Sequence, residues 1–153
     1  MFGLFSKKPE RYFSEEEKQK IVAAIQSAER QTSGEVRIYI ENRCAYVNPL
    51  HRAQELFFSL KMEQTAERNG VLVYIAMKDR QLAVFGDEGI HQKVGSTFWN
   101  EEVGKMLAEF KQQKYADGLA SIIEDIGNAL THHFPYDNKG DKNELPDDIV
   151  FGK

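Results

Sequence analysis

The stretch VLVYIAMKDRQLAVF, residues 71–85, decides the fold, because it reads as a strand, a tight turn and a second strand. Residues 71–77 form an unbroken apolar run, which is typical of a strand buried on both faces of a sheet. Residues 78–81 are polar and short enough for a turn, and residues 82–85 are apolar again. The stretch therefore predicts a hairpin whose first strand lies in the middle of a sheet with helices on both faces.

Two helices and one strand are predicted before this hairpin. Ser14 and Glu17 have the spacing of a capping box, which predicts that a helix begins at their position. Residues 35–41 alternate apolar with polar side chains, as expected for a strand with one fully apolar face. Asn48 followed by Pro49 predicts the start of a second helix, because proline is favoured at the first helical position.

Two further helices are predicted after the hairpin, along residues 103–110 and 119–130, with a short helical turn near residues 90–94 before them. The order α-β-α-β-β-α-α describes a single-domain α/β fold with a small mixed sheet. The first two strands should be parallel, because a helix connects them, and that crossover should be right-handed. The third strand should run antiparallel beside the second.

Composition excludes several classes of protein. The 153 residues carry a net charge of −4 with scattered basic residues, so no basic stripe for nucleic acid is predicted. A single cysteine, Cys44, excludes an internal disulfide and a cysteine-based zinc site. In the start MFGLFSKKPE the lysines follow the apolar residues, whereas a secretory signal has its basic residues first. No segment approaches the roughly 18 apolar residues of a membrane span. The sequence therefore predicts a cytoplasmic chain without a transmembrane segment.

Three glycine-containing loops should meet at one edge of the predicted sheet. The parallel strands begin at this edge and the third strand ends there. The side chains brought together would be those of Glu35, Asn69, Asp87 and Glu88. Calcium prefers six to eight oxygen ligands of this kind. Two interpretations stay open for the GDEG segment at residues 86–89: a cation site, or a turn in which Asp87 caps a helix.

Three segments also resemble a known family, the TPM domain. They are TSGEVRIYIE at 32–41, RNGVLVYIAMKDRQLAVFGDEGI at 68–90, and YADGLASIIEDIGNALTHHFP at 115–135. The resemblance implies a Rossmann-like α/β/α sandwich and the binding of calcium or other divalent cations, with Asp87, Glu88 and Glu35 as the best matches. It is closest to the soluble bacterial branch and implies a non-enzymatic accessory role, with a protein partner.

A competing site is predicted at the opposite edge, where the parallel strands end, since ligands of open α/β sheets usually bind there. Arg43 should lie there with Asp79 and Arg80 of the hairpin turn, beside residues 41, 42 and 44. The mixture of arginines and acids favours a protein partner or an anion over a cation.

The family resemblance also implies an alternative function, a metal-assisted phosphatase acting on phosphate esters. It would use the carboxylates of the predicted cation site, with Arg37 or Arg68 holding the phosphate. The chain contains neither G-x-S-x-G nor H-E-x-x-H, so no catalytic residue is predicted from a motif.

The predicted domain covers residues 14–135, between a flexible N-terminus at 1–13 and a mobile acidic tail at 136–153. The tail segment DNKGDKNE (137–144) fails the pattern of an EF-hand, because lysines replace a ligand and the required glycine. Residues 145–151 contain Leu145, Ile149, Val150 and Phe151, so this segment is expected to dock, in an extended form, on the domain or on a partner.

Overall fold

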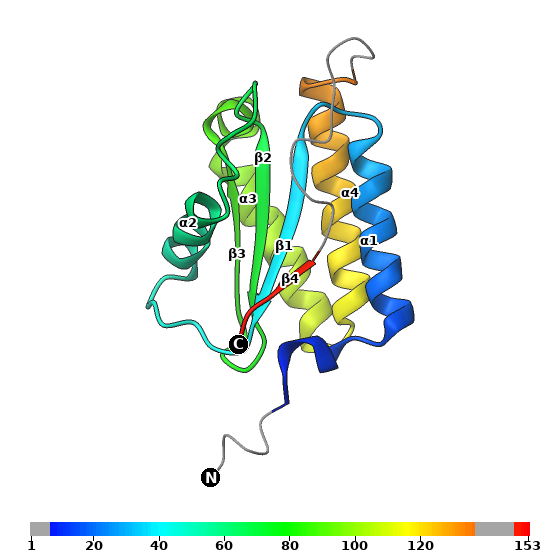
Figure 1. Ribbon diagram of the computed structural model, residues 1–153, viewed down its shortest axis with the longest axis vertical. Coiled ribbons are helices and arrows are strands. Elements are labelled where there is room, and N and C mark those ends of the chain that lie inside the picture. Colours follow the sequence, from blue (N-terminus) through cyan, green and yellow to red (C-terminus); the bar gives the residue numbers. More distant parts are fainter. Residues whose placement is uncertain (1–6, 137–148) are drawn as a thin grey trace.

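A four-stranded sheet of order β3-β2-β1-β4 forms the centre of the protein in the computed structural model, which describes residues 7–136 and 149–153 (Figure 1). β1 (Glu35–Glu41) is parallel to β2 (Gly70–Ala76), and β3 (Gln81–Gly86) is antiparallel to β2. Every residue of β2 is buried. The parallel pair, the hairpin and the central position of β2 are thus confirmed.

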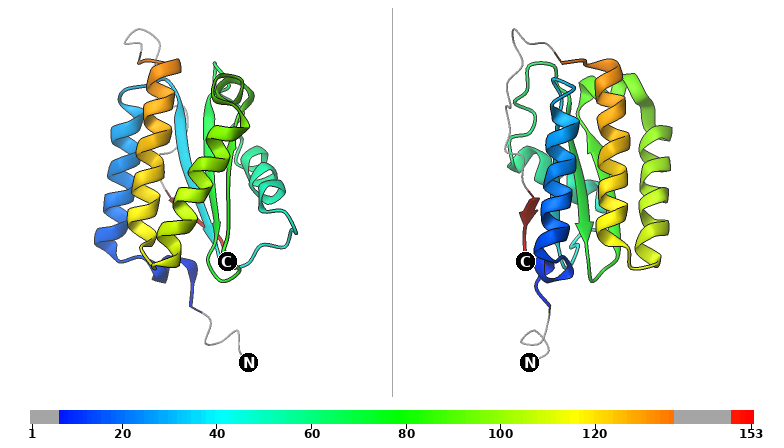
Figure 2. Two further views of the ribbon diagram at one scale, coloured as in Figure 1. Left: turned by 180° about the vertical axis from the view of Figure 1, so that it is seen from behind. Right: turned by 90° about the vertical axis from the view of Figure 1, so that its right-hand side faces the viewer.

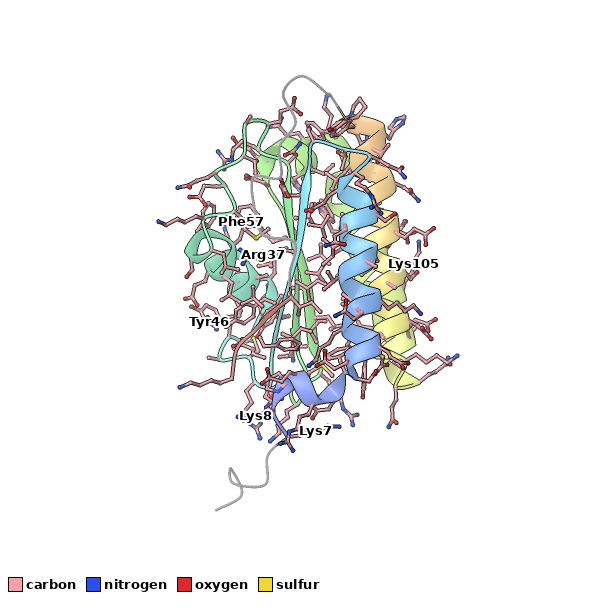
Figure 3. All side chains as sticks on the ribbon, turned by 45° about the vertical axis from the view of Figure 1, so that its right-hand side comes forward. Lys7, Lys8, Arg37, Tyr46, Phe57 and Lys105 are labelled. Carbon is pink, nitrogen blue, oxygen red and sulfur yellow. The ribbon has the colours of Figure 1, made fainter. Side chains whose placement is uncertain are left out.

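Helices cover both faces of this sheet (Figure 2). One face carries three helices, which are α1 (Glu15–Glu29), α3 (Glu88–Lys111) and α4 (Tyr115–His133). The other face carries α2 (Pro49–Ser59), whose Phe57 lies between the helix and the sheet (Figure 3) and contacts the ring of Phe85. The expected single-domain α/β sandwich is confirmed, with a large core under the three helices and a smaller one under α2.

The two predicted helix starts are confirmed by their hydrogen bonds. The Ser14 hydroxyl accepts a bond from the Glu17 amide at 3.1 Å, and the Glu17 carboxylate accepts one from the Ser14 amide at 2.9 Å. The Asn48 side chain accepts a bond from the Leu50 amide at 2.9 Å, ahead of a proline at the first helical position. Such caps satisfy amides that have no partner within the helix.

The two helices predicted after the hairpin are confirmed, because residues 103–110 lie in α3 and residues 119–130 lie in α4. The predicted turn near residues 90–94 and the helix at 103–110 are both parts of α3, which bends at Gly95. Gly95 has a φ of 79°, a left-handed conformation that glycine adopts at little cost. The bend lets one continuous segment follow the sheet edge and then pack against α4.

The ends of the domain also differ from the prediction. Residues 7–13 were expected to belong to a flexible N-terminus, but Pro9–Tyr12 form the short helix η2, and Pro9 and Phe13 are buried. Phe13 contacts the ring of Tyr115 at the start of α4. Residues 1–6 lie outside the described part of the chain. The domain therefore begins before the capping box, because the buried Phe13 packs against the start of α4.

A fourth strand, β4 (Ile149–Phe151), is absent from the predicted order and pairs in parallel with β1. The Gly152 amide donates to the Ile40 carbonyl at 2.8 Å, and Ile149 and Phe151 pack against the larger core. The described part of the expected docking segment, 149–151, is thus extended and attached to the domain. Residues 137–148, including the EF-hand-like segment, lie outside the described residues. Among the described helices, none is long and apolar enough to cross a membrane.

Removing residues 149–153 should lower the free energy of unfolding by about 2 kcal/mol, because two partly buried apolar side chains and the β1 pairing are lost. Urea unfolding measures this. Removal of the exposed Lys153 alone is the matched control and should change nothing. Equal stability of the two truncated chains would show that β4 contributes no binding energy to the sheet.

Candidate functional site

The three glycine-containing loops do meet at one edge of the sheet, and backbone hydrogen bonds join them. The Glu35 amide donates to the Asn69 carbonyl at 3.4 Å, and the Asp87 amide donates to the Gly70 carbonyl at 2.9 Å. The start of α3 is tied to the same place, since the Gly89 amide donates to the Arg68 carbonyl at 2.8 Å. This three-loop edge, defined by residues 33–35, 68–70 and 86–89, is therefore one connected unit.

Asp87 is the centre of the three-loop edge. Its side chain accepts a bond from the Glu88 amide at 2.8 Å and caps α3, so the helix-cap interpretation of the GDEG segment is confirmed. The same carboxylate receives the fork of Arg68, with Nε at 2.7 Å and a terminal nitrogen at 2.9 Å. Only 3% of the Asp87 side chain is exposed, against 37% of the Arg68 side chain, so this two-pronged ion pair is buried on the carboxylate side and open on the guanidinium side.

Arg68 connects the two adjacent carboxylates. Its other terminal nitrogen lies 3.1 Å from the Glu88 carboxylate, and Glu88 is mostly exposed. Hydrogen bonding to Asp87 raises the pKa of the guanidinium, so the side chain stays charged. Arg68 also has a left-handed backbone, φ 52°, which is uncommon for a residue other than glycine. The turn that carries this arginine is thus held in a special conformation beside the carboxylates.

The other two predicted ligands, in the neighbouring loops, are both buried. Asn69 has no exposed surface, and its side-chain nitrogen donates to the Ser33 hydroxyl at 3.1 Å. Its side-chain oxygen is buried and accepts no hydrogen bond from the described residues. Glu35, at the start of β1, is also buried. A buried amide oxygen without a donor is a group that a cation could satisfy.

The arrangement as it stands is not a preformed metal site. Within residues 7–136 and 149–153, no three histidine, cysteine, aspartate or glutamate side chains converge closely enough to hold a metal ion. Both oxygens of Asp87 already bind Arg68. The predicted residues fit a divalent cation only if the guanidinium leaves the carboxylate, which its partly exposed side chain allows.

The predicted partner-binding residues do meet at the opposite edge. A terminal nitrogen of Arg43 lies 3.2 Å from the Asp79 carboxylate, which also accepts a bond from the Cys44 amide at 2.7 Å. Arg80 occupies the hairpin turn in a left-handed conformation, φ 53°. The Asn42 carbonyl accepts bonds from the amides of residues 78 and 79, so the turn is fastened to the end of β1.

Comparison with known proteins assigns the chain to a family. A family model described as the TPM domain matches residues 6–129. The chain belongs to the TPM domain family. This agrees with the resemblance of the three segments and with the observed fold. Among curated proteins, none matched the chain.

Two solved structures share the fold of this TPM domain. The NMR structure of BA42 protein from the psychrophilic bacterium Bizionia argentinensis is 38% identical, covering 92% of this chain and 95% of that chain, with a TM-score of 0.82. The solution NMR structure of the N-terminal domain of cg2496 protein from Corynebacterium glutamicum is 12% identical. It covers 90% of this chain and 80% of that chain with a TM-score of 0.61, so it supports the fold alone.

Sequence reasoning about the TPM domain missed the role of Arg68, which was considered only as a phosphate-binding group. It also missed a second buried ion pair, in which the Arg52 fork binds Glu41 with two contacts of 2.9 Å. The hydroxyl of Tyr74 donates to the same carboxylate, and burial together with this bond raises the tyrosine pKa. This pair could have been suspected from the positions of Glu41 and Tyr74 in their strands. Both side chains point to the α2 face, where a buried polar group needs a partner.

Proposed function

We propose that this TPM domain is a non-enzymatic, cytoplasmic binding domain that takes up a divalent cation, calcium first, at the three-loop edge and also binds a protein partner. The observation that supports it best is the Arg68 fork on Asp87 and Glu88, a positive group held by two adjacent carboxylates. The buried Asn69 oxygen, which accepts no bond from the described residues, adds a neutral oxygen ligand of the kind that calcium uses.

In this proposal calcium and Arg68 compete for the same carboxylates. Cation binding requires the guanidinium to leave Asp87, and the long arginine side chain can then extend into solvent. The lost ion pair is subtracted from the binding energy of calcium, so the intact domain should bind weakly, with a dissociation constant of about 1 mM. Calcium binding would also stabilise the folded state by mass action.

Replacing Arg68 with glutamine should strengthen calcium binding at least about tenfold, because the competing charge is removed while the Asp87 and Glu88 carboxylates remain. Amide NMR during a calcium titration measures the dissociation constant and locates the shifts. The matched control is Arg43→Gln, which removes an arginine–aspartate pair at the opposite edge and should leave calcium affinity unchanged.

A second variant separates the site from general charge effects. Asp87→Asn should abolish the calcium response at Asn69 and Glu88. An absence of shifts at the three-loop edge up to about 10 mM calcium, in both the intact domain and Arg68→Gln, would contradict the proposal. Equal affinity in the intact domain and Arg68→Gln would also contradict it, because competition would then be absent.

The protein partner is proposed for the opposite edge, where the Arg43 side chain is largely exposed and Arg80 occupies the turn. The phosphatase alternative gains no support from the geometry, because Arg68, one of its two phosphate-binding candidates, is engaged by Asp87 and Glu88. Turnover of a phosphate ester that disappears in Asp87→Asn would revive it.

A further inference from the structure

β3 is an edge strand, and its hydrogen-bonding pattern leaves three residues facing outward. The Asp87 amide donates to the Gly70 carbonyl, and the register places these two residues opposite each other across β2 and β3. In an antiparallel pair, bonded and non-bonded positions alternate. Residues 81, 83 and 85 therefore bond to β2, whereas the amides and carbonyls of Leu82, Val84 and Gly86 point away from the sheet. No described residue hydrogen-bonds these outward groups.

The outward edge of β3 lies in a groove of about 760 Å³ that has walls of different chemistry. On the α2 side the wall is apolar, with Leu50 and Phe58 exposed by 42% and 45%. On the α3 side the wall is mixed, with the polar residues His91, Ser96 and Asn100 beside Trp99 and Val103. Figures 1 and 2 show α2 and α3 on opposite sides of β3, so the strand edge is the floor between two helices.

Gly86 marks the end of this groove nearest to the three-loop edge. A Cβ at this position would lie 2.3 Å from the Trp99 ring, so the indole packs directly on the strand backbone there. The Trp99 nitrogen donates to His91 at 3.0 Å, which orients the α3 wall. Glu88 and Arg68 line the same end of the groove, and together with Asp87 they give it a net charge of −1. This end therefore favours a positive group on an occupant.

We propose that this groove binds an extended peptide segment of a partner protein, which adds as a strand to β3. The unpaired amides and carbonyls of Leu82, Val84 and Gly86 require an extended backbone as their partner. Alternate side chains of the segment should be apolar where they face Leu50 and Phe58, and polar where they face α3. A lysine or arginine of the segment lies against Glu88. The site is distinct from the partner surface proposed at Arg43 and Arg80.

A single peptide strand fits this groove better than the edge of a second copy of the chain. The helical walls α2 and α3 both contribute to the groove lining, so the β3 edge is recessed between them. A second copy carries the same two walls, which would meet the walls of the first before the two edges could pair. A strand without attached helices meets no such obstacle. β3 has six residues, and a matching strand spans about 20 Å.

The test uses synthetic peptides of about six residues in which valine and threonine alternate, with one lysine at either the N-terminal or the C-terminal end. Binding is followed by NMR and amide hydrogen exchange of the full chain. We expect new exchange protection at the amides of Leu82, Val84 and Gly86. The amides of Ala83 and Phe85 should not change, because they already bond to β2. Replacing the lysine by glutamate should weaken binding.

Two matched comparisons, one between modified peptides and one between protein variants, distinguish strand addition from nonspecific hydrophobic binding. Methylating the backbone nitrogens of every second peptide residue blocks one edge of a strand, so one of the two alternating patterns should abolish binding and the other should preserve it. In the protein, Phe58→Ser should weaken binding at least tenfold. Leu107→Ser, at a similarly exposed residue that does not line the groove, should leave binding unchanged.

Several outcomes would overturn the proposal. One is the absence of binding by either peptide at millimolar concentration, and another is equal binding of the two methylated patterns. Protection that spreads over β3 without alternation would also contradict it. A concentration-dependent dimer in sedimentation experiments, dissociated by Phe58→Ser, would assign the groove to a second copy of the chain instead of a partner peptide.

Discussion

Replacing Gly89 with alanine should lower the free energy of unfolding by about 3 kcal/mol, because the new methyl group has no space. A Cβ on Gly89 would lie 2.1 Å from the carbonyl oxygen of Glu67 and 2.6 Å from that of Arg68. Both obstacles are backbone atoms, so no side chain can rotate to relieve the overlap. The turn at residues 65–69 would have to separate from the start of α3, and the Gly89–Arg68 hydrogen bond of 2.8 Å would be lost.

Gly104→Ala is the matched control, since Gly104 belongs to the same helix and a Cβ there meets nothing within 4 Å. It should stabilise the protein by about 0.5–1 kcal/mol, the usual gain of alanine over glycine inside a helix. Urea unfolding of the two variants measures both effects. A Gly89→Ala protein as stable as the original would show that the turn is not held against α3. The variant should also separate Arg68 from Asp87, which amide NMR would reveal.

Glu102→Gln should stabilise the protein at pH 8 by about 2 to 3 kcal/mol and leave it nearly unchanged below pH 4.5. Glu102 is almost fully buried between α3 and α4. Burial, followed by a hydrogen bond with Asp125, raises its pKa from 4.5 to about 7, and the ammonium of Lys105 opposes this increase. The structure therefore favours the protonated carboxyl group, and ionising it costs free energy in the folded state.

The sign of the effect follows from proton binding. Because the folded-state pKa is the higher one, the stabilising contribution of Glu102 is complete below pH 4.5 and is lost as the pH rises through about 7. Glutamine has nearly the same shape but cannot ionise, so the variant does not lose stability as the pH rises. The ion pair with Lys105, a mostly exposed side chain, already opposes the increase of the Glu102 pKa, so its loss in the variant is included in the expected gain of about 2 to 3 kcal/mol.

Urea unfolding of both proteins at pH 5 and pH 8 measures the prediction. Glu101→Gln is the control, because the neighbouring glutamate is exposed and its replacement should have the same small effect at both values. A stability difference between Glu102→Gln and the original that did not change with pH would mean that the carboxyl group titrates normally and is hydrated in the folded protein.

The sequence by itself determined the fold class, the order and bounds of most elements, and the place where the three loops meet. The apolar run at 71–77 is long enough to require cover on both faces, and the capping box at Ser14 begins a helix by bonds between residues three positions apart. These are local or periodic signals, which short stretches of chain carry without help from distant residues. The parallel pairing and the common edge then follow from the handedness and length of the connections.

Only the tertiary structure decided what each candidate residue contacts. The sequence places Glu35, Asn69, Asp87 and Glu88 at one edge, yet the fork of Arg68 on Asp87 depends on a left-handed turn and on atoms positioned within a few tenths of an ångström. The pairing of β4 with β1 joins segments about a hundred residues apart through three residues, too few to show a periodic pattern. The burial of Glu102 likewise arises where two helices cross. Such contacts come from the packing of distant elements against one another, which local propensity and charge pattern do not encode.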